Sequence, residues 1–384
     1  MKRRFPAAVS TVAVAATLAL AAAACGSSSD SGSSSSTYKI GVLNALTGDL
    51  GAVGQQEDQG IELAVSQINA AGGINGKKLS LVKVDDQGSV NLSTAGFKKL
   101  ATSDKVQAIV GPGISASALA VAPLADQYKV AQVLMVAQPD TVNGTRNVFE
   151  AAPPGKSNSE AMVKYAADSG AKSAALIWAD NAYGQEGLKD ISAATQADGM
   201  SLVSNESWDP SKFDFTAQAG KVASENPDVV FLYGAGGTSD ATLLKAVRAS
   251  GYKGKVVGDL SYAASTIPKA AGSASDTAVG LTALGYAAPT AVEKKFIDDF
   301  QAKYNSIPTV LSAYAYEAVQ LVAAGIKKGG YNGDKIAAAI QGMNFDNGLI
   351  GTYDFTKDYH GGPGVSAFKP VSFDSSGNYV KPVF

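Results

Sequence analysis

The sequence predicts an α/β fold made of two doubly wound, Rossmann-like lobes. Short apolar runs alternate with longer amphipathic runs along most of the chain, as in parallel sheets whose strands are connected by helices. The alternation stops once, at Pro153-Pro154-Gly155, and then restarts. Because 46% of the residues are hydrophobic and only one is cysteine, we expect core burial rather than disulfides to stabilise the protein.

The first lobe is expected to begin at residue 38. Its clearest helix is 60–71, where apolar residues from Ile61 to Ile68 recur at i, i+3, i+4 and i+7. Gly72-Gly73 ends this helix, because glycine adopts the left-handed C-cap conformation at little cost. The other elements alternate around it: strands 38–43, 79–84, 106–110 and 132–136, and helices 92–102 and 115–128.

The second lobe is expected from residue 153 and follows the same alternation. Its strands are predicted at 173–178, 201–206, 229–233 and 255–258, and its helices at 160–168, 185–198, 215–224 and 238–250. A crossing segment at 279–284 precedes two long helices, 290–304 and 312–328, which are expected to return to the first lobe. The tail from residue 351 is hairpin-like, with a turn at Ser375-Ser376-Gly377. The expected lobes are therefore 38–152 with 285–349, and 153–284 with 350–384.

The N-terminus is typical of an exported lipoprotein. A cationic start, Lys2-Arg3-Arg4, precedes an apolar run at 7–24, and Cys25 follows directly. We expect a signal peptide at 1–24, acylation of Cys25, and a Ser/Gly tether at 25–37 that anchors the protein to the outer face of the cell membrane. The alternative is an ordinary secretory signal with a chance cysteine.

Composition excludes several classes of function. Once Lys2-Arg3-Arg4 are removed from the 32 basic residues, 29 remain against 34 acidic ones, a net charge of −5 (29 − 34). No basic stripe indicates a nucleic-acid partner. The chain has one histidine, His360, and no Gly-x-Ser-x-Gly elbow, so neither nucleophilic catalysis nor a His/Cys metal site is supported. We expect no enzyme activity, no metal and no cofactor.

The binding site is expected where the strands end. In open α/β sheets, ligands bind beyond the carboxyl ends of the strands. Six loops follow those ends and would converge on one cleft if the lobes face each other: 45–53, 111–116, 136–140, 180–184, 233–237 and 258–263.

Ser115 is the first candidate ligand residue. It lies in Gly111-Pro112-Gly113-Ile114-Ser115-Ala116, between a strand and a helix, and is predicted as an N-cap beside free N–H groups that suit a carboxylate. The same stretch fits a dinucleotide loop only loosely, because no acidic residue stands about 20 positions later at the end of the next strand. Alternatively, Ser115 merely caps its own helix.

Two more candidates follow strands of the second half. Tyr183 lies in Asp180-Asn181-Ala182-Tyr183-Gly184, where its ring could close over an apolar part of a ligand or pack on its own lobe. Asp259 follows the strand that ends at Gly258. Its carboxylate could bind a ligand ammonium or simply hydrogen-bond within its own loop.

Several stretches from Tyr38 to the C-terminus together resemble one family. The most specific is Ile68-Asn69-Ala70-Ala71-Gly72-Gly73-Ile74-Asn75-Gly76, followed by Leu79 and Asp85-Asp86. The others are Ile40-Gly41-Val42, Leu46-Thr47-Gly48, Gly60-Ile61-Glu62-Leu63-Ala64-Val65, Val110-Gly111-Pro112, Tyr183-Gly184, Pro227-Asp228-Val229-Val230 and Ala315-Tyr316-Glu317-Ala318-Val319. On these residues the chain resembles the type I solute-binding proteins of ABC importers, in the branched-chain amino acid (leucine/isoleucine/valine-binding) group.

The resemblance implies the type I periplasmic-binding-protein fold, with two lobes joined by three crossovers. It implies that the lobes close on a solute by hinge bending and that the closed form docks on a membrane permease. The family's carboxylate-binding serine corresponds to Ser115, its threonine in the next loop to Gln138, and its pocket tyrosine to Tyr183. Ala116 and Val136 complete the expected set beside them. We expect a monomer.

Departures from the family pattern concern the solute. The glutamate that binds the ammonium in amino acid binders corresponds to Leu260, with Asp259 beside it. Bulky aromatic residues of the family pocket correspond to Ala235 and Val53. The smaller lining favours a larger or aromatic solute, and the missing glutamate favours one without an ammonium unless Asp259 substitutes.

The leading hypothesis is a lipid-anchored solute-binding protein of an ABC importer. It would capture a small carboxylate-bearing solute, either an amino acid or a related compound that includes aromatic acids. The alternative is a sensing ectodomain that presents its ligand to a partner receptor. An extracellular hydrolase is disfavoured by the single histidine.

Replacing Cys25 with alanine tests the anchor. Without the thiol no lipid can be attached, so Cys25→Ala is expected to lose incorporation of labelled fatty acid and to leave the membrane fraction. Metabolic labelling and cell fractionation measure the two effects. Equal membrane retention of the variant and the wild type would contradict a lipid anchor at this residue.

Overall fold

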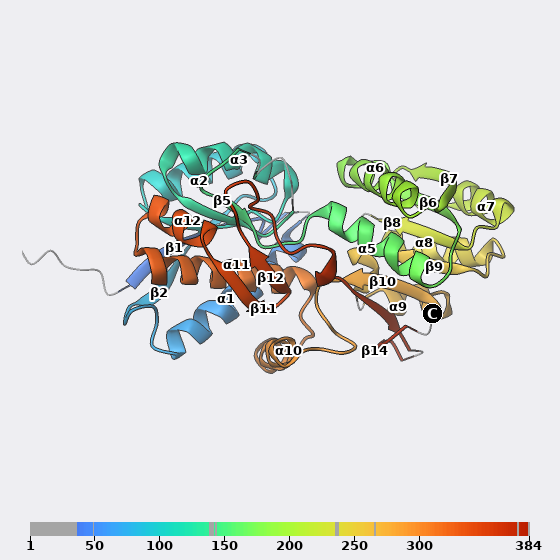
Figure 1. The fold of residues 1–384 in the computed structure, drawn as a ribbon. Helices are drawn as coiled ribbons and strands as arrows, with labels where there is room; N and C mark the ends of the chain where they lie inside the picture. The colour runs from blue at the N-terminus through green and yellow to red at the C-terminus, as the bar shows by residue number, and fades with distance from the viewer. Residues whose placement is uncertain are drawn as a thin grey trace, which may run out of the picture. The chain divides into compact units, whose positions relative to one another are not determined.

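Two mainly parallel β-sheets, each packed against helices on both faces, make up the structure (Figure 1). This computed structural model describes residues 37–48, 50–137, 142, 144–234, 238–264, 266–374 and 376–382, all of which belong to the unit Ser36–Phe384. Cys25, the predicted signal peptide and the predicted turn residue Ser375 lie outside the described residues.

The first lobe is built around a five-stranded sheet. Its strands are β1 (Thr37–Asn44), β2 (Lys78–Asp85), β3 (Ala108–Val110), β4 (Ala131–Leu134) and β5 (Val148–Glu150). They are parallel and lie in the order β2-β1-β3-β4-β5. The helices of this lobe are α1 (Gly51–Ala70), α2 (Val90–Thr102), α3 (Ser115–Tyr128), α10 (Ala291–Tyr304), α11 (Val310–Gly329) and α12 (Gly333–Gln341).

Both faces of this sheet are buried. Ile40 and Val42 of β1 belong to a hydrophobic cluster with α1 and α11, whereas Leu43 belongs to another with α2 and α3. Successive strand residues point to opposite faces, so this alternation places helices on either side of the sheet.

The second lobe has a seven-stranded sheet in the order β14-β13-β10-β9-β8-β6-β7. Its parallel strands are β6 (Ser173–Ala179), β7 (Ser201–Trp208), β8 (Val229–Tyr233), β9 (Lys255–Gly258) and β10 (Ala278–Thr282). Two antiparallel strands, β13 (Lys369–Phe373) and β14 (Tyr379–Val380), extend the sheet. Its helices are α5 (Gly155–Asp168), α6 (Ala182–Ala197), α7 (Thr216–Glu225), α8 (Thr238–Ala249), α9 (Thr266–Ala271) and the 3₁₀ turns η1 (Leu260–Ala263) and η2 (Gly272–Ser275).

Helices α1 and α11 are far apart in the sequence but pack side by side (Figure 1). A Cβ placed on Gly60 would lie 2.1 Å from the backbone oxygen of Ser312, so this approach requires glycine. Tyr316 Oη donates to Gln67 Oε1 (2.6 Å) across the same contact. The second long helix therefore returns to the first lobe, as the sequence predicted.

Several elements differ from the prediction: β5 and α9 were not predicted, α5 begins earlier, and α1 and α12 differ as follows. Helix α1 begins at Gly51 instead of residue 60. The sequence did not indicate its first turns, because they lack apolar periodicity and are held in place by tertiary contacts. A Cβ on Gly54 would lie 1.9 Å from the Ala45 oxygen. Helix α12 was not predicted; its Ile336 and Ile340 complete the cluster under α11.

The last crossing between the lobes falls later than residue 350, where the sequence placed it. The turn η3 (Val365–Ala367) contacts both lobes, because Val365 packs against a cluster of the second lobe, whereas the hairpin of β11 (Asn344–Gly348) and β12 (Gly351–Asp354) stays with the first lobe. Tyr353, Phe355 and Ala367 belong to its hydrophobic cluster. Only from β13 does the chain pair with the second sheet, because its partner there is β10.

His360 fixes this tail to the first lobe. Its ring stacks on Phe149, with centroids 4.4 Å apart, and its Nδ1 lies 2.9 Å from the Val148 oxygen. Its backbone oxygen accepts from Glu150 N at 2.9 Å. The only histidine of the sequence is therefore a buried structural residue.

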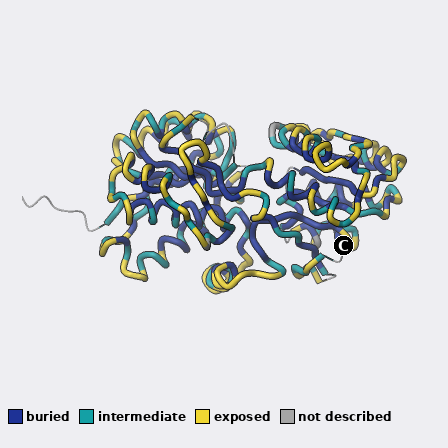
Figure 2. Tube along the Cα trace, in the orientation of Figure 1, coloured by how far each residue is buried: buried dark blue, intermediate teal, exposed yellow. Residues whose placement is uncertain are grey.

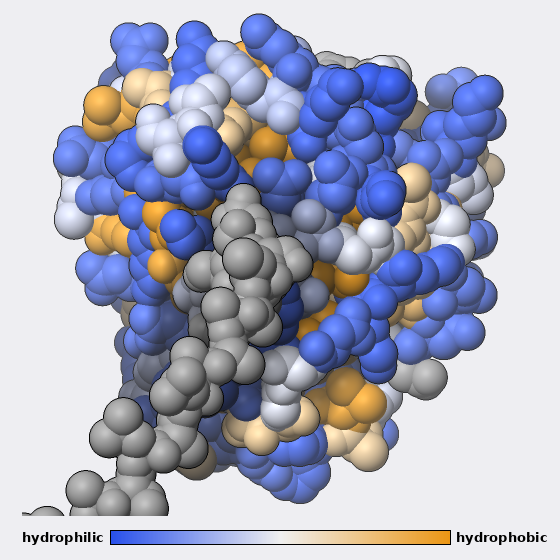
Figure 3. Space-filling model, turned by 90° about the vertical axis from the view of Figure 1, so that its left-hand side faces the viewer, coloured by the Kyte–Doolittle hydropathy of each residue, from blue (hydrophilic) through white to orange (hydrophobic). Residues whose placement is uncertain are grey.

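Figure 2 shows buried residues along the strands of both sheets and exposed ones on the outer helices. The face in Figure 3 is largely hydrophilic, with hydrophobic residues interspersed among polar ones. Among the described residues, no helix combines the length and the apolar character needed to cross a membrane.

His360 is expected to make the unfolding free energy depend on pH. Burial lowers the pKa of His360 below its ordinary 6.5, so the unfolded chain binds a proton there more readily than the folded chain does. Its stabilising contribution is complete above the unfolded pKa and declines as the pH falls below it.

The matched variant is His360→Phe, which keeps a ring on Phe149 but cannot be protonated. Denaturant titrations at about pH 7.5 and about pH 5 measure the unfolding free energy of both proteins. The unfolding free energy of the wild type, relative to that of the variant, should be smaller at the lower pH. An unchanged difference would show that His360 stays neutral or is equally protonated in both states.

Candidate functional site

Ser115 is the first residue of α3, not its N-cap as the sequence predicted. Ile114 occupies the N-cap position with an extended backbone, and no side chain makes a capping hydrogen bond. The Ser115 hydroxyl is therefore not used by its own helix, and the first N–H groups of α3 have no intrahelical acceptor. Because half-buried Ser115 and exposed Ala116 follow β3 closely, hydroxyl and N–H donors gather at the carboxyl edge of the first sheet.

A buried carboxyl lies against the loop that leads into α3. Glu57 of α1 is 1% exposed, and neither of its carboxyl oxygens has a hydrogen-bond partner among the described residues. A Cβ on Gly113 would lie 2.1 Å from Glu57 Oε1, so glycine at this position lets the loop approach the acid. Burial, helped by the charge of Asp86 and opposed by the amide of Asn44, raises the pKa of Glu57 to about 8.

Asp86 is buried as well, but its carboxylate is hydrogen-bonded. It accepts from Gly88 N (2.9 Å) and from Ser93 Oγ (2.7 Å). Ser93 Oγ also lies 2.8 Å from Ser117 Oγ in the first turn of α3. These contacts connect the end of β2 to the start of α3 and help to position the donors of Ser115 and Ala116.

Asp259 lies at the end of β9 and is fully buried. Its carboxylate accepts from Ser261 N (2.9 Å) and Gly234 N (3.2 Å). Ser261 Oγ lies 2.5 Å from Asp259 Oδ1 and 2.6 Å from Asp240 Oδ2. The single hydroxyl proton of Ser261 can be donated to only one of the two carboxylates at a time. Burial and the charge of Asp240 raise the pKa of Asp259 to about 7.

Tyr183 lies beside this acid pair. It is the second residue of α6, whose N-cap Asn181 accepts from Gly184 N (2.9 Å). The ring is half-buried and lies 4.7 Å from the ring of Tyr233, centroid to centroid. Its hydroxyl is buried without a hydrogen-bond partner among the described residues. Burial, with the charge of Asp259, raises the pKa of Tyr183 well above its usual range.

The remaining predicted residues are divided between the lobes. Val136 is half-buried against the cluster of α2 and α3. Leu260, the first residue of η1, packs against the hydrophobic cluster of the first lobe, as does Ala137. The end of β9, a strand of the second lobe, is therefore in contact with the first lobe through Leu260. Gln138 and Ala235 lie outside the described residues.

Sequence reasoning missed Glu57, Asp240 and Ser261. Glu57 stands in a polar stretch between the predicted loop 45–53 and the predicted helix 60–71, so nothing marked its side chain as buried. Asp240 lies in the first turn of α8, where an acid is an ordinary helix-start residue. The one signal for Asp240 and Ser261 was that two strands end next to each other, near Gly234 and Asp259. The elements that follow these strands, α8 and η1, are thereby brought together.

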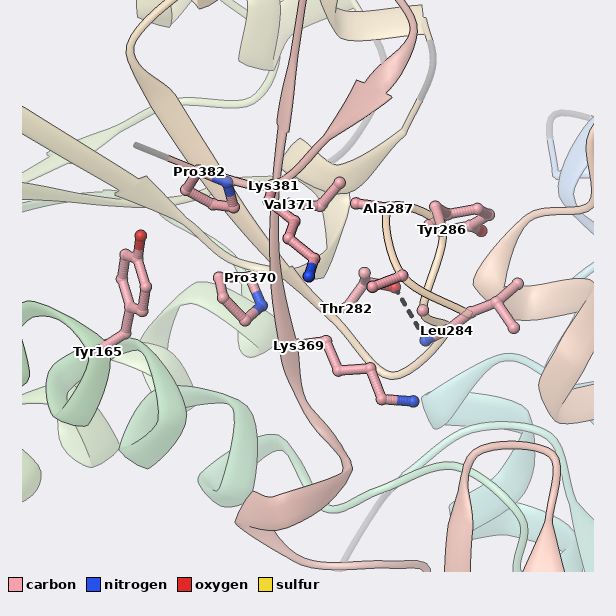
Figure 4. Close-up of a pocket in the computed structure, with 12 residues that line it drawn as sticks. Tyr165, Thr282, Leu284, Tyr286, Ala287, Lys369, Pro370, Val371, Lys381 and Pro382 are labelled. Atoms are coloured by element: carbon pink, nitrogen blue, oxygen red, sulfur yellow. Dashed lines mark hydrogen bonds between the residues drawn. The ribbon is translucent and has the colours of Figure 1, made fainter. Parts of the chain in front are cut away.

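A cavity of about 350 Å³ lies away from these residues (Figure 4). It is lined by Tyr165, by β10 and the chain after it, by β13 and by the C-terminal segment. None of the predicted site residues that the structure describes lines it. Its Lys369 pairs with buried Glu293, so that charge is already compensated. The cavity is a gap between crossover segments rather than part of the candidate site.

Across the described residues, no cluster of three or more His, Cys, Asp or Glu side chains could hold a metal ion. What the strand ends offer is hydroxyl and N–H donors from the first lobe, and aromatic and aliphatic side chains from the second. Such a set can bind a small anion with an apolar body.

Comparisons with known proteins identify the family. Residues 37–377 match the family described as "Periplasmic binding protein". The Leu/Ile/Val-binding protein homolog 3 of Brucella melitensis is 30% identical over 305 residues, covering 78% of this chain and 81% of that protein. The Leu/Ile/Val-binding protein BraC3 of Rhizobium johnstonii is 30% identical over 311 residues, covering 78% and 82%.

Solved structures agree on the fold. LivJ of Streptococcus pneumoniae, a branched-chain amino acid transporter substrate-binding protein in complex with isoleucine, gives a TM-score of 0.76 at 24% identity, covering 89% of this chain and 97% of that one. A solute-binding protein from Rhodopseudomonas palustris BisB5 in complex with 3,4-dihydroxy benzoic acid gives 0.72 at 24% identity, covering 90% and 91%. The predicted fold class is confirmed, and the chain belongs to the periplasmic binding proteins of type I, in the branched-chain amino acid group.

Proposed function

We propose that this protein captures a small carboxylate-bearing solute between its two lobes and delivers it to an ABC permease. The observation that carries the proposal is the start of α3, where Ser115 makes no capping hydrogen bond and stands at the end of the short loop that follows β3. Its hydroxyl and the first N–H groups of the helix would bind the solute carboxylate, beside Ala116 and Gln138.

The solute we propose is an acid whose binding needs no ammonium. In the resemblance to the family, Leu260 corresponds to the glutamate of the amino acid binders. The neighbouring carboxyl of Asp259 is fully buried and hydrogen-bonded to Ser261 and Gly234. Tyr183, Val136, Leu260 and Ala235 would surround the apolar body of such a solute, which suits an aromatic acid as well as an aliphatic one.

Transport is supported by the family membership and by the proposed anchor. A lipid on Cys25 would hold the protein at the outer face of the cell membrane, where the permease lies. Hinge closure of the lobes around the solute would present both lobes to the permease together. The protein would act as a monomer and would not turn over its solute.

The function is tested with purified protein and a panel that includes isoleucine, leucine, benzoate and 3,4-dihydroxybenzoate. A bound solute should raise the free energy of unfolding by about 2.7 kcal/mol at roughly a hundred times its Kd. Thermal unfolding and isothermal titration calorimetry measure this effect. A broad panel of carboxylates, none of which stabilises the protein, would count against solute capture.

Ser115→Ala is expected to weaken the binding of the identified solute by roughly 1–3 kcal/mol, because it leaves a bound carboxylate short of one hydrogen bond. Ser201→Ala, at the exposed amino end of β7, is the matched control. Asp259→Asn should leave the affinity for a simple acid unchanged, because the carboxyl faces Ser261 and Gly234 inside its own lobe. Unchanged affinity of Ser115→Ala would place the carboxylate elsewhere.

A further inference from the structure

We propose that Glu57 holds a proton at neutral pH and that this proton lets an anionic solute bind at the start of α3. The proton follows from the surroundings of Glu57 in the structure. The anion rests on the proposed function, so the two halves are tested by separate measurements.

Among the residues that the structure describes, no cation pairs with Glu57. The charged group that faces it is Asp86, which follows β2 and has the same sign. The amide of Asn44 in β1 also lies against it, and its Nδ2 donates to Gly54 O (3.0 Å). Lys83 of β2 pairs instead with Asp58 and Glu62 of α1, at 2.7 Å each.

The neighbouring helix does not supply a cation either. Helix α11 meets α1 at Gly60, where backbone packs on backbone. An ionised carboxylate that is dry and unpaired costs far more than a neutral carboxylic acid in the same place. Glu57 therefore avoids this cost by remaining protonated, and its raised pKa of about 8 agrees with the geometry.

The Glu57 carboxyl contacts the loop that leads into α3. Gly113 lies directly over the Glu57 carboxyl, and Ser115 follows two residues later. A solute carboxylate at the start of α3 would bring a second negative charge to this loop. If Glu57 were ionised, the two like charges would repel each other in surroundings with little water.

Thermodynamic linkage then fixes the direction of the effect. The solute binds better to the protein with protonated Glu57, so binding raises the proton affinity of Glu57 by the same factor. Near pH 8, solute binding should take up a proton from solvent. Above that pH the affinity for an anionic solute should fall. A rise of about one pKa unit on binding corresponds to a tenfold loss of affinity at high pH.

The proton is tested on the solute-free protein. Carbon-13 labelling of the glutamate side-chain carboxyls, with NMR titration from pH 5 to pH 10, follows each acid. The signal that disappears in Glu57→Gln is expected to titrate with a midpoint near 8. A midpoint below pH 6 would overturn the proposal whether or not a solute is known.

The effect on anion binding is tested by calorimetry with two probes. Benzoate has a carboxylate that stays ionised from pH 6 to pH 9.5. For L-isoleucine, the titration of its own ammonium is subtracted from the measured proton exchange. The wild type should bind benzoate about tenfold more weakly at pH 9.5 than at pH 7, with proton uptake near pH 8. In Glu57→Gln the affinity should not depend on pH and no proton should be taken up.

Glu317→Gln is the matched control. Glu317 is also buried, and burial raises its pKa to about 8, but its carboxyl accepts from Leu349 N far along the chain from α3. This variant should keep the pH dependence of the wild type. Asp58→Asn, on the outer side of α1, serves the same purpose should Glu317→Gln fail to fold.

Three results would contradict the proposal. One is a wild-type affinity that stays constant to pH 9.5, and another is a Glu57→Gln variant that weakens as the wild type does. The third is an absence of binding by both probes, which would contradict the anion half together with the proposed function. A Glu57 signal near pH 8 would then still establish the protonated acid.

Discussion

The burial of acids without a compensating cation is the constraint on which the strand-end loops depend. Each lobe has a buried acid under the loops that leave its sheet: Glu57 in the first lobe, with no hydrogen-bond partner among the described residues, and Asp259 in the second. A dry carboxylate is costly, so burial raises the pKa of Glu57 and of Asp259. A protonated Glu57 lets Gly113 lie against it, and Ser261 connects α8 to the end of β9. Under the proposed function, recognition at these edges would rely on hydroxyl and N–H donors rather than on a formal positive charge.

Much of the fold could be predicted because the spacing of apolar residues along the sequence indicates which residues face a hydrophobic core. Helix α3 and strands β8 and β9 have the predicted bounds, since their apolar spacing and their flanking glycines leave little choice. The start of α1 could not be predicted, because its first turns are helical through contacts such as Gly54 on Ala45. The last crossing was misplaced for a similar reason. No local pattern tells whether Tyr353 or His360 packs on the first lobe or the second, and only the partner in space decides it.

The candidate site was predictable in position but not in its supporting chemistry. Strand ends locate Ser115, Tyr183 and Asp259 from the sequence, because parallel strands deliver their loops to one edge. The direction of a side chain depends on neighbours that a single sequence does not reveal. Asp259 was predicted as a candidate for a ligand ammonium, whereas its carboxyl faces inward to Ser261 and Gly234. Glu57 has a charged side chain in a polar stretch, and its burial follows only from the packing of α1 on the sheet.

The path of the chain has a consequence for its biosynthesis. The first lobe lacks the helix that covers α1 until Val310–Gly329 has been made, and it lacks Tyr353 and His360 until later still. The second sheet is incomplete until Lys369–Phe373 pairs with β10. Neither half therefore has all its parts until the residues of β13 have been made. Domains that are contiguous in sequence can mature one after another during translation. The two halves of this chain are interleaved instead, so neither can complete its sheet and core independently of the segments that follow the other, and under the proposed export both would still be incomplete while the chain crosses the membrane.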